Sequence, residues 1–208
     1  MWSSEVTNMI ITGIWETLYM TLVSTLVGYV IGLPMGIILT VSDKDGIKPN
    51  AVLYKILDVI ANIVRSVPFI ILLVLLIPFT RLVVGKSYGS TATIVPLVIA
   101  AAPYIARMVE SSLKEVDAGV IEAARSMGAS NFTIITKVML VEARTSLLVG
   151  ATITLGTILG YSAMSGAVGG GGLGAIAIRY GYTRWQTDIM IVTVILLFIL
   201  FQIFQTVG

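Results

Sequence analysis

The sequence predicts an all-α integral membrane protein with five transmembrane helices. Apolar residues make up 57% of the 208 residues and charged residues only 12%, which is about half the charged share of a soluble domain. The mean hydropathy is +0.99. The chain contains five long stretches with few or no charges, and each can cross about 30 Å of hydrocarbon at roughly 1.5 Å per residue. Such a chain cannot cover a water-facing surface of its own.

The five predicted spans are separated by polar turns or charged segments. They lie at residues 17–42, 57–84, 87–106, 145–178 and 189–208. The second span contains Asp58, Arg65 and Arg81, and Pro68 is expected to kink it. The fourth stretch runs for 34 residues without a charge, which is enough for one helix and a glycine-rich re-entry.

Basic residues predict the orientation of the chain in the membrane. Eight of them follow the first span or lie between the third and fourth: Lys44, Lys48, Lys55, Arg107, Lys114, Arg125, Lys137 and Arg144. Four are assigned to the other side of the membrane: Arg81, Lys86, Arg179 and Arg184. Arg65 lies within the second span and is not counted. By the positive-inside rule, the larger group is cytoplasmic, so the N-terminus is expected outside and the C-terminus inside. A cleaved signal peptide is not expected, because the N-terminus lacks a basic region and carries Glu5 and Glu16.

Several classes of function are excluded by missing residue types. The chain has no His and no Cys, so zinc sites, iron–sulfur clusters, cysteine nucleophiles and Ser-His-Asp triads are ruled out. The net charge of +2 is too small to indicate a nucleic-acid partner. We therefore expect no catalytic residue, no metal site and no cofactor in this chain.

A charged segment at about residues 110–145 separates the third and fourth spans. Glu110 and Lys114 are four residues apart, a spacing that extends the third helix into water. Asp117 is placed to cap a helix of about ten residues, Gly128 to end it in the left-handed conformation, and Ser130 to cap the next helix. Two interpretations remain open: an ordinary amphipathic linker, or a rigid docking helix for a cytoplasmic partner.

The spacing within this segment resembles a known family. Glu122-Ala123-Ala124, then Gly128, then Val138-x-Leu140 is similar to the EAA loop of bacterial ABC-importer permeases, although Val141 stands where proline is usual. In that family the loop forms a coupling helix that fits a cleft on the ATP-hydrolysing subunit, with the small alanine side chains allowing close approach. The resemblance implies these ATPase-coupling residues: Asp117, Glu122, Ala123, Ala124, Arg125 and Gly128.

Other segments extend the resemblance along nearly the whole chain. The segments that look like permeases of methionine importers are RSVPF at 65–69, APYIARMVE at 102–110, GYSAM at 160–164, and the glycines of 166–174. The resemblance implies a type I ABC importer permease fold, with residues 1–208 as a single transmembrane domain of a homodimer. It also implies membrane lipid around that dimer, two ATPase subunits that bind ATP and Mg, and a methionine-binding protein or lipoprotein outside the bacterial cytoplasmic (inner) membrane.

Polar residues inside the spans are candidates for a translocation path. Four of them recur at spacings of three and four in the second span: Lys55, Asp58, Asn62 and Arg65. They share one helix face, and they either snorkel to the interface, face an inner vestibule or brace the coupling helix. The resemblance implies that Tyr161, Ser162 and Met164 line the path near the two-fold axis. Arg65 is the fourth candidate, and a core role for Met164 remains open.

Glycines occur at helix-packing spacing and in one dense run. Glycines four apart at 28, 32 and 36, and at 156 and 160, let helices approach closely, either within one subunit or at a dimer seam. The run at 166–174 lacks the Gly-Lys-Ser/Thr of a nucleotide-binding loop. We expect a pliable outer turn there.

Two classes of function are compared. The first is a permease without chemistry of its own, in which separate subunits hydrolyse ATP and drive alternating access in a homodimer. By the resemblance its cargo is methionine, D- or L-, and another small neutral amino acid is the alternative. The second is a stand-alone secondary transporter, which is expected to carry carboxylates or His for ion coupling inside its spans. The first, third, fourth and fifth spans are uncharged, which favours the permease.

Overall fold

The computed structural model describes residues 4–207, and these residues form helices joined by short turns. The α-helices are α1 (Ser4–Ser42), α2 (Ala51–Ser66), α3 (Phe69–Leu75), α4 (Ile77–Val84), α5 (Ser90–Lys114), α6 (Ala118–Ser126), α7 (Asn131–Thr133), α8 (Leu140–Glu142), α9 (Arg144–Ser165), α10 (Gly172–Ile176) and α11 (Thr187–Val207). Wider π-helical turns occupy Ile134–Met139 and Ala177–Tyr182. The described part of the chain contains no strand, so the all-α prediction is confirmed.

Three of the predicted spans are continuous helices, whereas the fourth, Arg144–Tyr182, is interrupted by the glycine-rich turn between α9 and α10. Among the described residues, the segments that are long and apolar enough to cross a membrane are Ser4–Ser42, Ser90–Lys114, Arg144–Tyr182 and Thr187–Thr206. The first of these begins at Ser4 and not at residue 17. The charge of Glu16 does not interrupt the helix, because its carboxylate accepts a hydrogen bond from the Gly172 N–H at the start of α10.

The second predicted span is broken. The chain bends by 102° between α2 and α3, where Val67 is extended and Pro68 is the N-cap that precedes α3. Proline has no N–H for the helix ladder, and it disfavours the helical conformation in the residue before it. The expected single kinked helix over 57–84 is therefore wrong in detail: α2, α3 and α4 replace it, and Pro68 turns the chain instead of kinking it.

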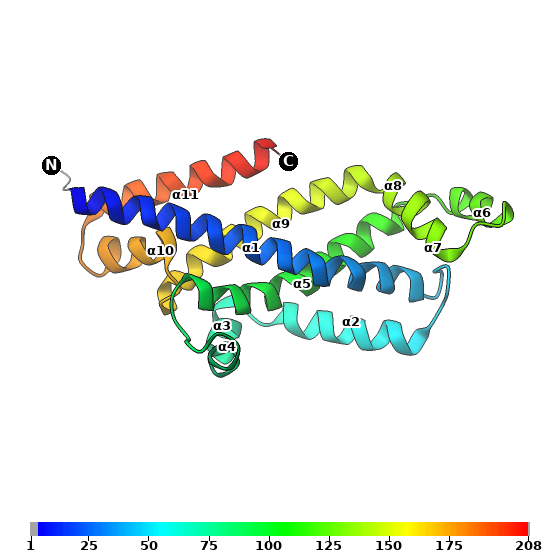
Figure 1. The fold of residues 1–208 in the computed structure, drawn as a ribbon, viewed down its shortest axis with the longest axis horizontal. Coiled ribbons are helices and arrows are strands. Elements are labelled where there is room, and N and C mark those ends of the chain that lie inside the picture. Colours follow the sequence, from blue (N-terminus) through cyan, green and yellow to red (C-terminus); the bar gives the residue numbers. More distant parts are fainter. Residues whose placement is uncertain (1–3, 208) are drawn as a thin grey trace.

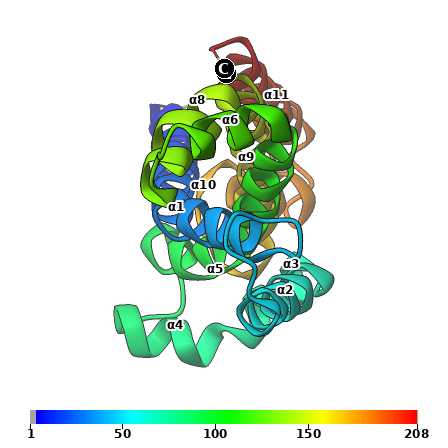
Figure 2. The ribbon, with the colours of Figure 1, turned by 90° about the vertical axis from the view of Figure 1, so that its right-hand side faces the viewer.

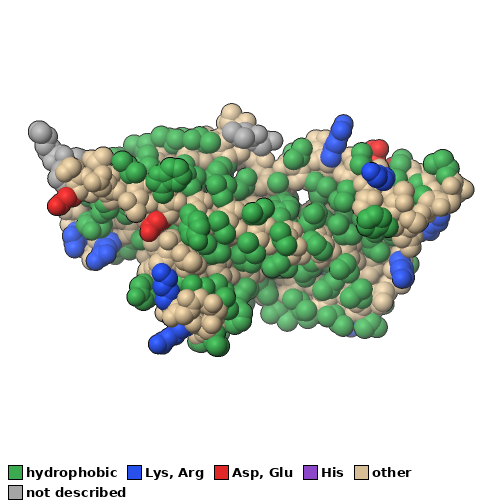
Figure 3. All heavy atoms as spheres, viewed as in Figure 1, with side chains coloured by type: hydrophobic (Ala, Val, Ile, Leu, Met, Phe, Trp, Pro, Cys, Tyr) green, Lys and Arg blue, Asp and Glu red, His purple; other side chains and the backbone are tan. Residues whose placement is uncertain are grey.

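The helices make an elongated bundle with distinct ends. Figure 1 shows α1 running along most of the long axis, with α6 and α7 at one end and α10 and the start of α11 at the other. Viewed along that axis, α4 projects from the body (Figure 2). Hydrophobic side chains cover most of the middle of the face in Figure 3, while Lys and Arg side chains gather toward the two ends. This is the distribution expected of a membrane-spanning body with two wetted ends.

Three glycines bring α1 and α5 into close contact. A Cβ on Gly28 would lie 2.9 Å from Ala101 Cβ, and a Cβ on Gly32 or Gly36 would lie 2.6 Å from a carbonyl oxygen of α5. Only glycine allows this approach. Of the two alternatives for this ridge, packing within one subunit is therefore correct for Gly28, Gly32 and Gly36.

The second glycine pair is divided between two environments. A Cβ on Gly156 would lie 2.6 Å from the Phe201 ring of α11, whereas a Cβ on Gly160 would meet nothing within 4 Å. Gly156 therefore packs against α11 of the same subunit, and Gly160 lies on an exposed face of α9.

Candidate functional site

The predicted helix of the 110–145 segment is present with its predicted ends. Asp117 accepts a hydrogen bond from the N–H of Gly119 at 2.7 Å and so caps α6. Gly128 has φ +79°, the left-handed conformation that ends a helix, and Ser130 caps α7 by accepting from Thr133 N–H at 3.2 Å. Both ends of α6 are thus fixed by local contacts.

The faces of α6 differ from the expected arrangement. Ala124 is 5% exposed and packs against the core, whereas Glu122, Ala123 and Arg125 are exposed. Successive residues of an α-helix point about 100° apart, so Ala123 and Ala124 do not form one small-residue face. Ala124 anchors the helix, and Glu122 with Ala123 is available to a partner.

A groove lies beside α6 at this end of the molecule. The guanidinium of Arg125 donates to the carbonyl of Ile47 at 3.0 Å, tying α6 to the loop between α1 and α2. The groove has a volume of about 490 Å³, and its charged lining residues are Asp43, Asp45, Lys114, Glu122 and Arg125.

Val141, where the EAA family usually has proline, lies in α8, and Ala143 separates α8 from α9.

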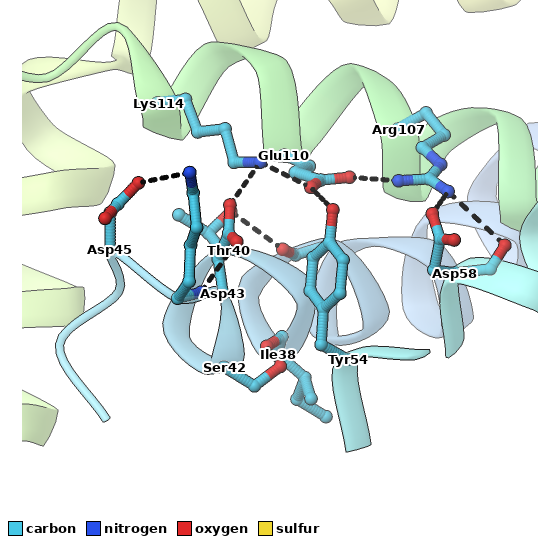
Figure 4. Close-up of polar contacts among 12 residues, drawn as sticks. Ile38, Thr40, Ser42, Asp43, Asp45, Tyr54, Asp58, Arg107, Glu110 and Lys114 are labelled. Atoms are coloured by element: carbon cyan, nitrogen blue, oxygen red, sulfur yellow. Dashed lines mark hydrogen bonds and ion pairs between the residues drawn. The ribbon is translucent and has the colours of Figure 1, made fainter. Parts of the chain in front are cut away.

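A network of charges joins α1, α2 and α5 next to this segment (Figure 4). Glu110 is 5% exposed. It accepts from Arg107 at 2.7 Å, from Lys114 at 2.8 Å and from the Tyr54 hydroxyl at 3.3 Å. The predicted pair of Glu110 and Lys114 is confirmed, but Glu110 lies in the protein interior and not in water.

Each cation of the network also holds a second helix. Lys114 Nζ lies 2.6 Å from Asp43, directly after α1, and Arg107 pairs with Asp58 of α2 and donates to Asn62 Oδ1 at 3.0 Å. Asp58 and Asn62 therefore neither snorkel nor brace α6: they fasten α2 to α5. Sequence reasoning missed Arg107 and Asp43, although the spacing of three between Arg107 and Glu110 was a usable signal.

The four candidates for the translocation path separate into two groups. Arg65 and Tyr161 line the same cavity of about 190 Å³, and the Tyr161 ring stacks on Phe69 with centroids 4.4 Å apart. Ser162 is 1% exposed and donates to the Leu159 carbonyl at 2.8 Å, so it does not line that cavity. Met164 is 52% exposed in the last turn of α9 and does not line it either.

The glycine-rich turn is held by both α1 and α5. Glu16 accepts from Gly172 N–H at 2.7 Å, and Thr17 Oγ1 accepts from Leu173 N–H at 2.9 Å. On the other side, Gly89 N–H donates to the Gly169 carbonyl at 2.8 Å. The turn expected to be pliable is thus fixed by hydrogen bonds, and Glu16 and Thr17 are site residues that sequence reasoning missed.

Comparison with known proteins identifies the family. Residues 32–207 match the family described as "Binding-protein-dependent transport system inner membrane component". The chain belongs to this family. It is therefore the permease subunit of an ABC importer and not an enzyme, because ATP hydrolysis resides in a separate subunit. Family membership favours the permease over the stand-alone secondary transporter.

Individual relatives match nearly the full chain. A probable D-methionine transport system permease protein MetI of Vibrio cholerae is 49% identical over 207 residues, covering 100% of this chain and 92% of the relative. The D-methionine transport system permease protein MetI of Escherichia coli is 52% identical over 158 residues, which cover 76% of this chain and 73% of the relative.

Solved structures share the fold. A chain of the inward-facing MetNI methionine ABC transporter has a TM-score of 0.97 and 51% identity, covering 100% of this chain and 96% of that one. A chain of an amino acid ABC transporter with histidines has a TM-score of 0.79 at 23% identity, and the match covers 98% of this chain and 92% of that one. At this identity the similarity shows only that the two chains share a fold. The predicted type I importer permease fold is confirmed.

Proposed function

We propose that this chain is the permease of an ATP-driven methionine importer. In this proposal residues 1–208 form one transmembrane domain and two copies form the translocating unit, which moves D- or L-methionine by alternating access. The likeness to the MetNI permease over 100% of the chain, with a TM-score of 0.97, carries the proposal.

The proposal also names partners and a placement in the membrane. Two ATP-binding subunits dock at the α6 end and bind ATP and Mg, and a methionine-binding protein or lipoprotein delivers cargo at the opposite end. The chain lies in a bacterial cytoplasmic membrane with the N-terminus outside and the C-terminus inside. The positive-inside rule supports this orientation.

The α6 residues have distinct roles in coupling. Exposed Glu122 and Ala123 contact the ATPase, and buried Ala124 passes the movement to the core. Asp117 and Gly128 hold the ends of the helix, and Arg125 ties it to the Ile47 carbonyl. A helix fixed at both ends moves as one body, which is what force transmission requires.

The translocation path uses the remaining candidates. Arg65 and Tyr161 line the cavity between α2, α3, α5 and α9, and exposed Met164 continues the path toward the outer end of α9. Ser162 acts indirectly, because its hydroxyl is bonded to the α9 backbone. The path therefore runs beside α9.

The test is uptake of a panel of labelled amino acids into proteoliposomes that contain the assembled transporter, with and without ATP. We expect ATP-dependent uptake of methionine. Uptake that proceeds equally without ATP, or that favours a different amino acid, would overturn the proposal.

Two variants test the coupling role. Gly128→Pro removes the N–H that donates to the Arg125 carbonyl at 3.0 Å. It also replaces the backbone angle φ of +79° by about −65°. Glu122→Lys reverses an exposed charge. Both are expected to abolish uptake without preventing membrane insertion. Lys44→Glu reverses a charge at the same end, outside α6, and is expected to retain uptake. ATP-driven uptake that survived both α6 variants would contradict docking through α6.

A further inference from the structure

Arg65 occupies an unusual place for a charged side chain. It lies in the last turn of α2, 15 residues beyond the N-cap Asn50, which is about 22 Å along the helix axis. Its side chain is exposed, and no described carboxylate lies within ion-pair distance of it, unlike Arg107, which has both Asp58 and Glu110. A charge deep in a span faces protein or a water-filled cavity and requires a partner.

The cavity beside Arg65 has the size and lining of a small-molecule site. Its volume of about 190 Å³ equals about six waters at roughly 30 Å³ each, which is the scale of one small amino acid and not of a peptide. Around it stand the Phe69–Tyr161 ring stack, Tyr104 and the aliphatic side chains of Leu72 and Ala100. No carboxylate is among its lining residues.

We propose that this cavity is a substrate-binding subsite of the permease. The Arg65 guanidinium receives the carboxylate of a small apolar amino acid, and the aromatic pair receives its side chain. A guanidinium matches a carboxylate with two parallel hydrogen bonds, and a thioether makes favourable contacts with aromatic rings. This inference rests on the proposed function, and it assigns part of the cargo recognition to the membrane subunit itself.

The arrangement of the elements also fits a site whose shape changes during transport. Arg65 ends α2, Phe69 begins α3 after the 102° bend, and Tyr104 and Tyr161 belong to α5 and α9. Four elements therefore contribute to one small volume. Movement of any of them changes the distance between the guanidinium and the ring stack, so binding and release of cargo are linked to the positions of the helices.

A thiol-protection experiment tests the subsite, because the chain has no cysteine of its own. Val64→Cys places a thiol in the cavity lining, and Val52→Cys places one on the same helix at an exposed position outside it. The transporter complex carrying either variant is labelled with a maleimide, and the labelling rate of this chain is measured with L-methionine or L-methioninamide, which lacks the carboxylate. Both variants are first checked for ATP-dependent uptake.

We expect methionine to slow labelling of Val64→Cys several-fold, methioninamide to have little effect, and neither to change labelling of Val52→Cys. Adding Arg65→Gln should abolish the protection, and Arg65→Lys should retain part of it. Equal protection by the amide, persistence of protection in Arg65→Gln, or no protection by methionine would each overturn the subsite. If the complex transports methionine with ATP but shows no protection, only the subsite fails. If the wild-type complex does not transport methionine, the proposed function fails.

Discussion

Lys114 forms an ion pair with Asp43 at 2.6 Å and thereby joins the end of α5 to the end of α1. The same ammonium lies 2.8 Å from Glu110, whose other oxygen holds Arg107. The last turn of α5, which leads directly into α6, is therefore attached to α1 through Asp43 and to α2 through the Tyr54 hydroxyl that Glu110 accepts from. If α6 couples transport to the ATPase as proposed, these charged contacts connect it to α1 and α2.

The Asp43 pair predicts an acid-sensitive contribution to stability. The hydrogen bond from Lys114 lowers the pKa of the Asp43 carboxyl below its usual value. Because the folded pKa is below the unfolded value of about 3.9, the contribution is present above about pH 4 and is lost as the pH falls through the folded pKa. Asp43→Asn should remove this pH dependence and cost roughly 1 kcal/mol or less. Thermal unfolding of the purified protein between neutral and acid pH measures it.

Asp45→Asn is the matched control for that experiment. Asp45 pairs with Lys44, but both side chains are more than four-fifths exposed, at 82% and 84%. Exposed pairs contribute little, so this variant should unfold like the wild type at each pH. Equal pH profiles for the Asp43→Asn and Asp45→Asn variants would contradict the assigned role of Lys114.

Glu110→Gln is expected to be more damaging than any change at an exposed charge. Glu110 is 5% exposed and is paired with two cations, and removing one member of a buried ionic network costs about 3–5 kcal/mol. The unfolding temperature in detergent should therefore fall sharply. Glu115→Gln, one helix turn away and exposed, is the control, and a fall of similar size in that variant would rule out this account.

Gly32→Ala should disrupt the contact between α1 and α5. The added Cβ would lie 2.6 Å from the Ala102 carbonyl oxygen, so the helices must separate, and overpacking of this kind costs about 1–3 kcal/mol. Gly150→Ala is the matched change, because its Cβ would meet only the Met108 side chain at 3.4 Å. Unfolding free energies that are unchanged in both variants would show that α5 does not require the Gly32 approach.

Thr17→Val should loosen the glycine-rich turn. The hydroxyl accepts from Leu173 N–H at 2.9 Å, and leaving a buried donor unpaired costs about 1–3 kcal/mol. Hydrogen exchange at Leu173 should accelerate. Thr157→Val removes a hydroxyl that bonds only its own helix, at Ile153, and should leave exchange at Leu173 unchanged. An unaltered rate at Leu173 in Thr17→Val would contradict the contact.

Local features of this fold could be predicted from the sequence, and tertiary pairings could not. Asp117, Gly128 and Ser130 act on backbone within a few residues of themselves, so their types and spacing were sufficient to place α6 and its ends. The spans were predictable because hydrocarbon selects for long uncharged stretches. By contrast, Arg107 meets Asp58 across 49 residues of sequence, and nothing near either residue specifies the other.

The glycines and Pro68 show why details of packing were not predictable. Spacing of four shows that Gly28, Gly32 and Gly36 share a face, but the same spacing would suit any opposing helix, in the same subunit or in a second copy. Proline predicts an interruption of the ladder, yet the 102° bend depends on the neighbours that α3 finds, including Tyr161. Arg65 and Tyr161 were both candidates for the path, and only the fold brings them into one cavity.

The length of α1 has a mechanical consequence. Its 39 residues make a rod of about 58 Å. The rod holds the glycine-rich turn through Glu16 and Thr17, which lie inside its first half, and it is followed at its C-terminal end by Asp43, which holds Lys114. Between these contacts, Gly28, Gly32 and Gly36 lie against α5. One continuous helix therefore joins the glycine-rich turn to the charge network, so a displacement of α1 at either contact is carried along the helix to the other.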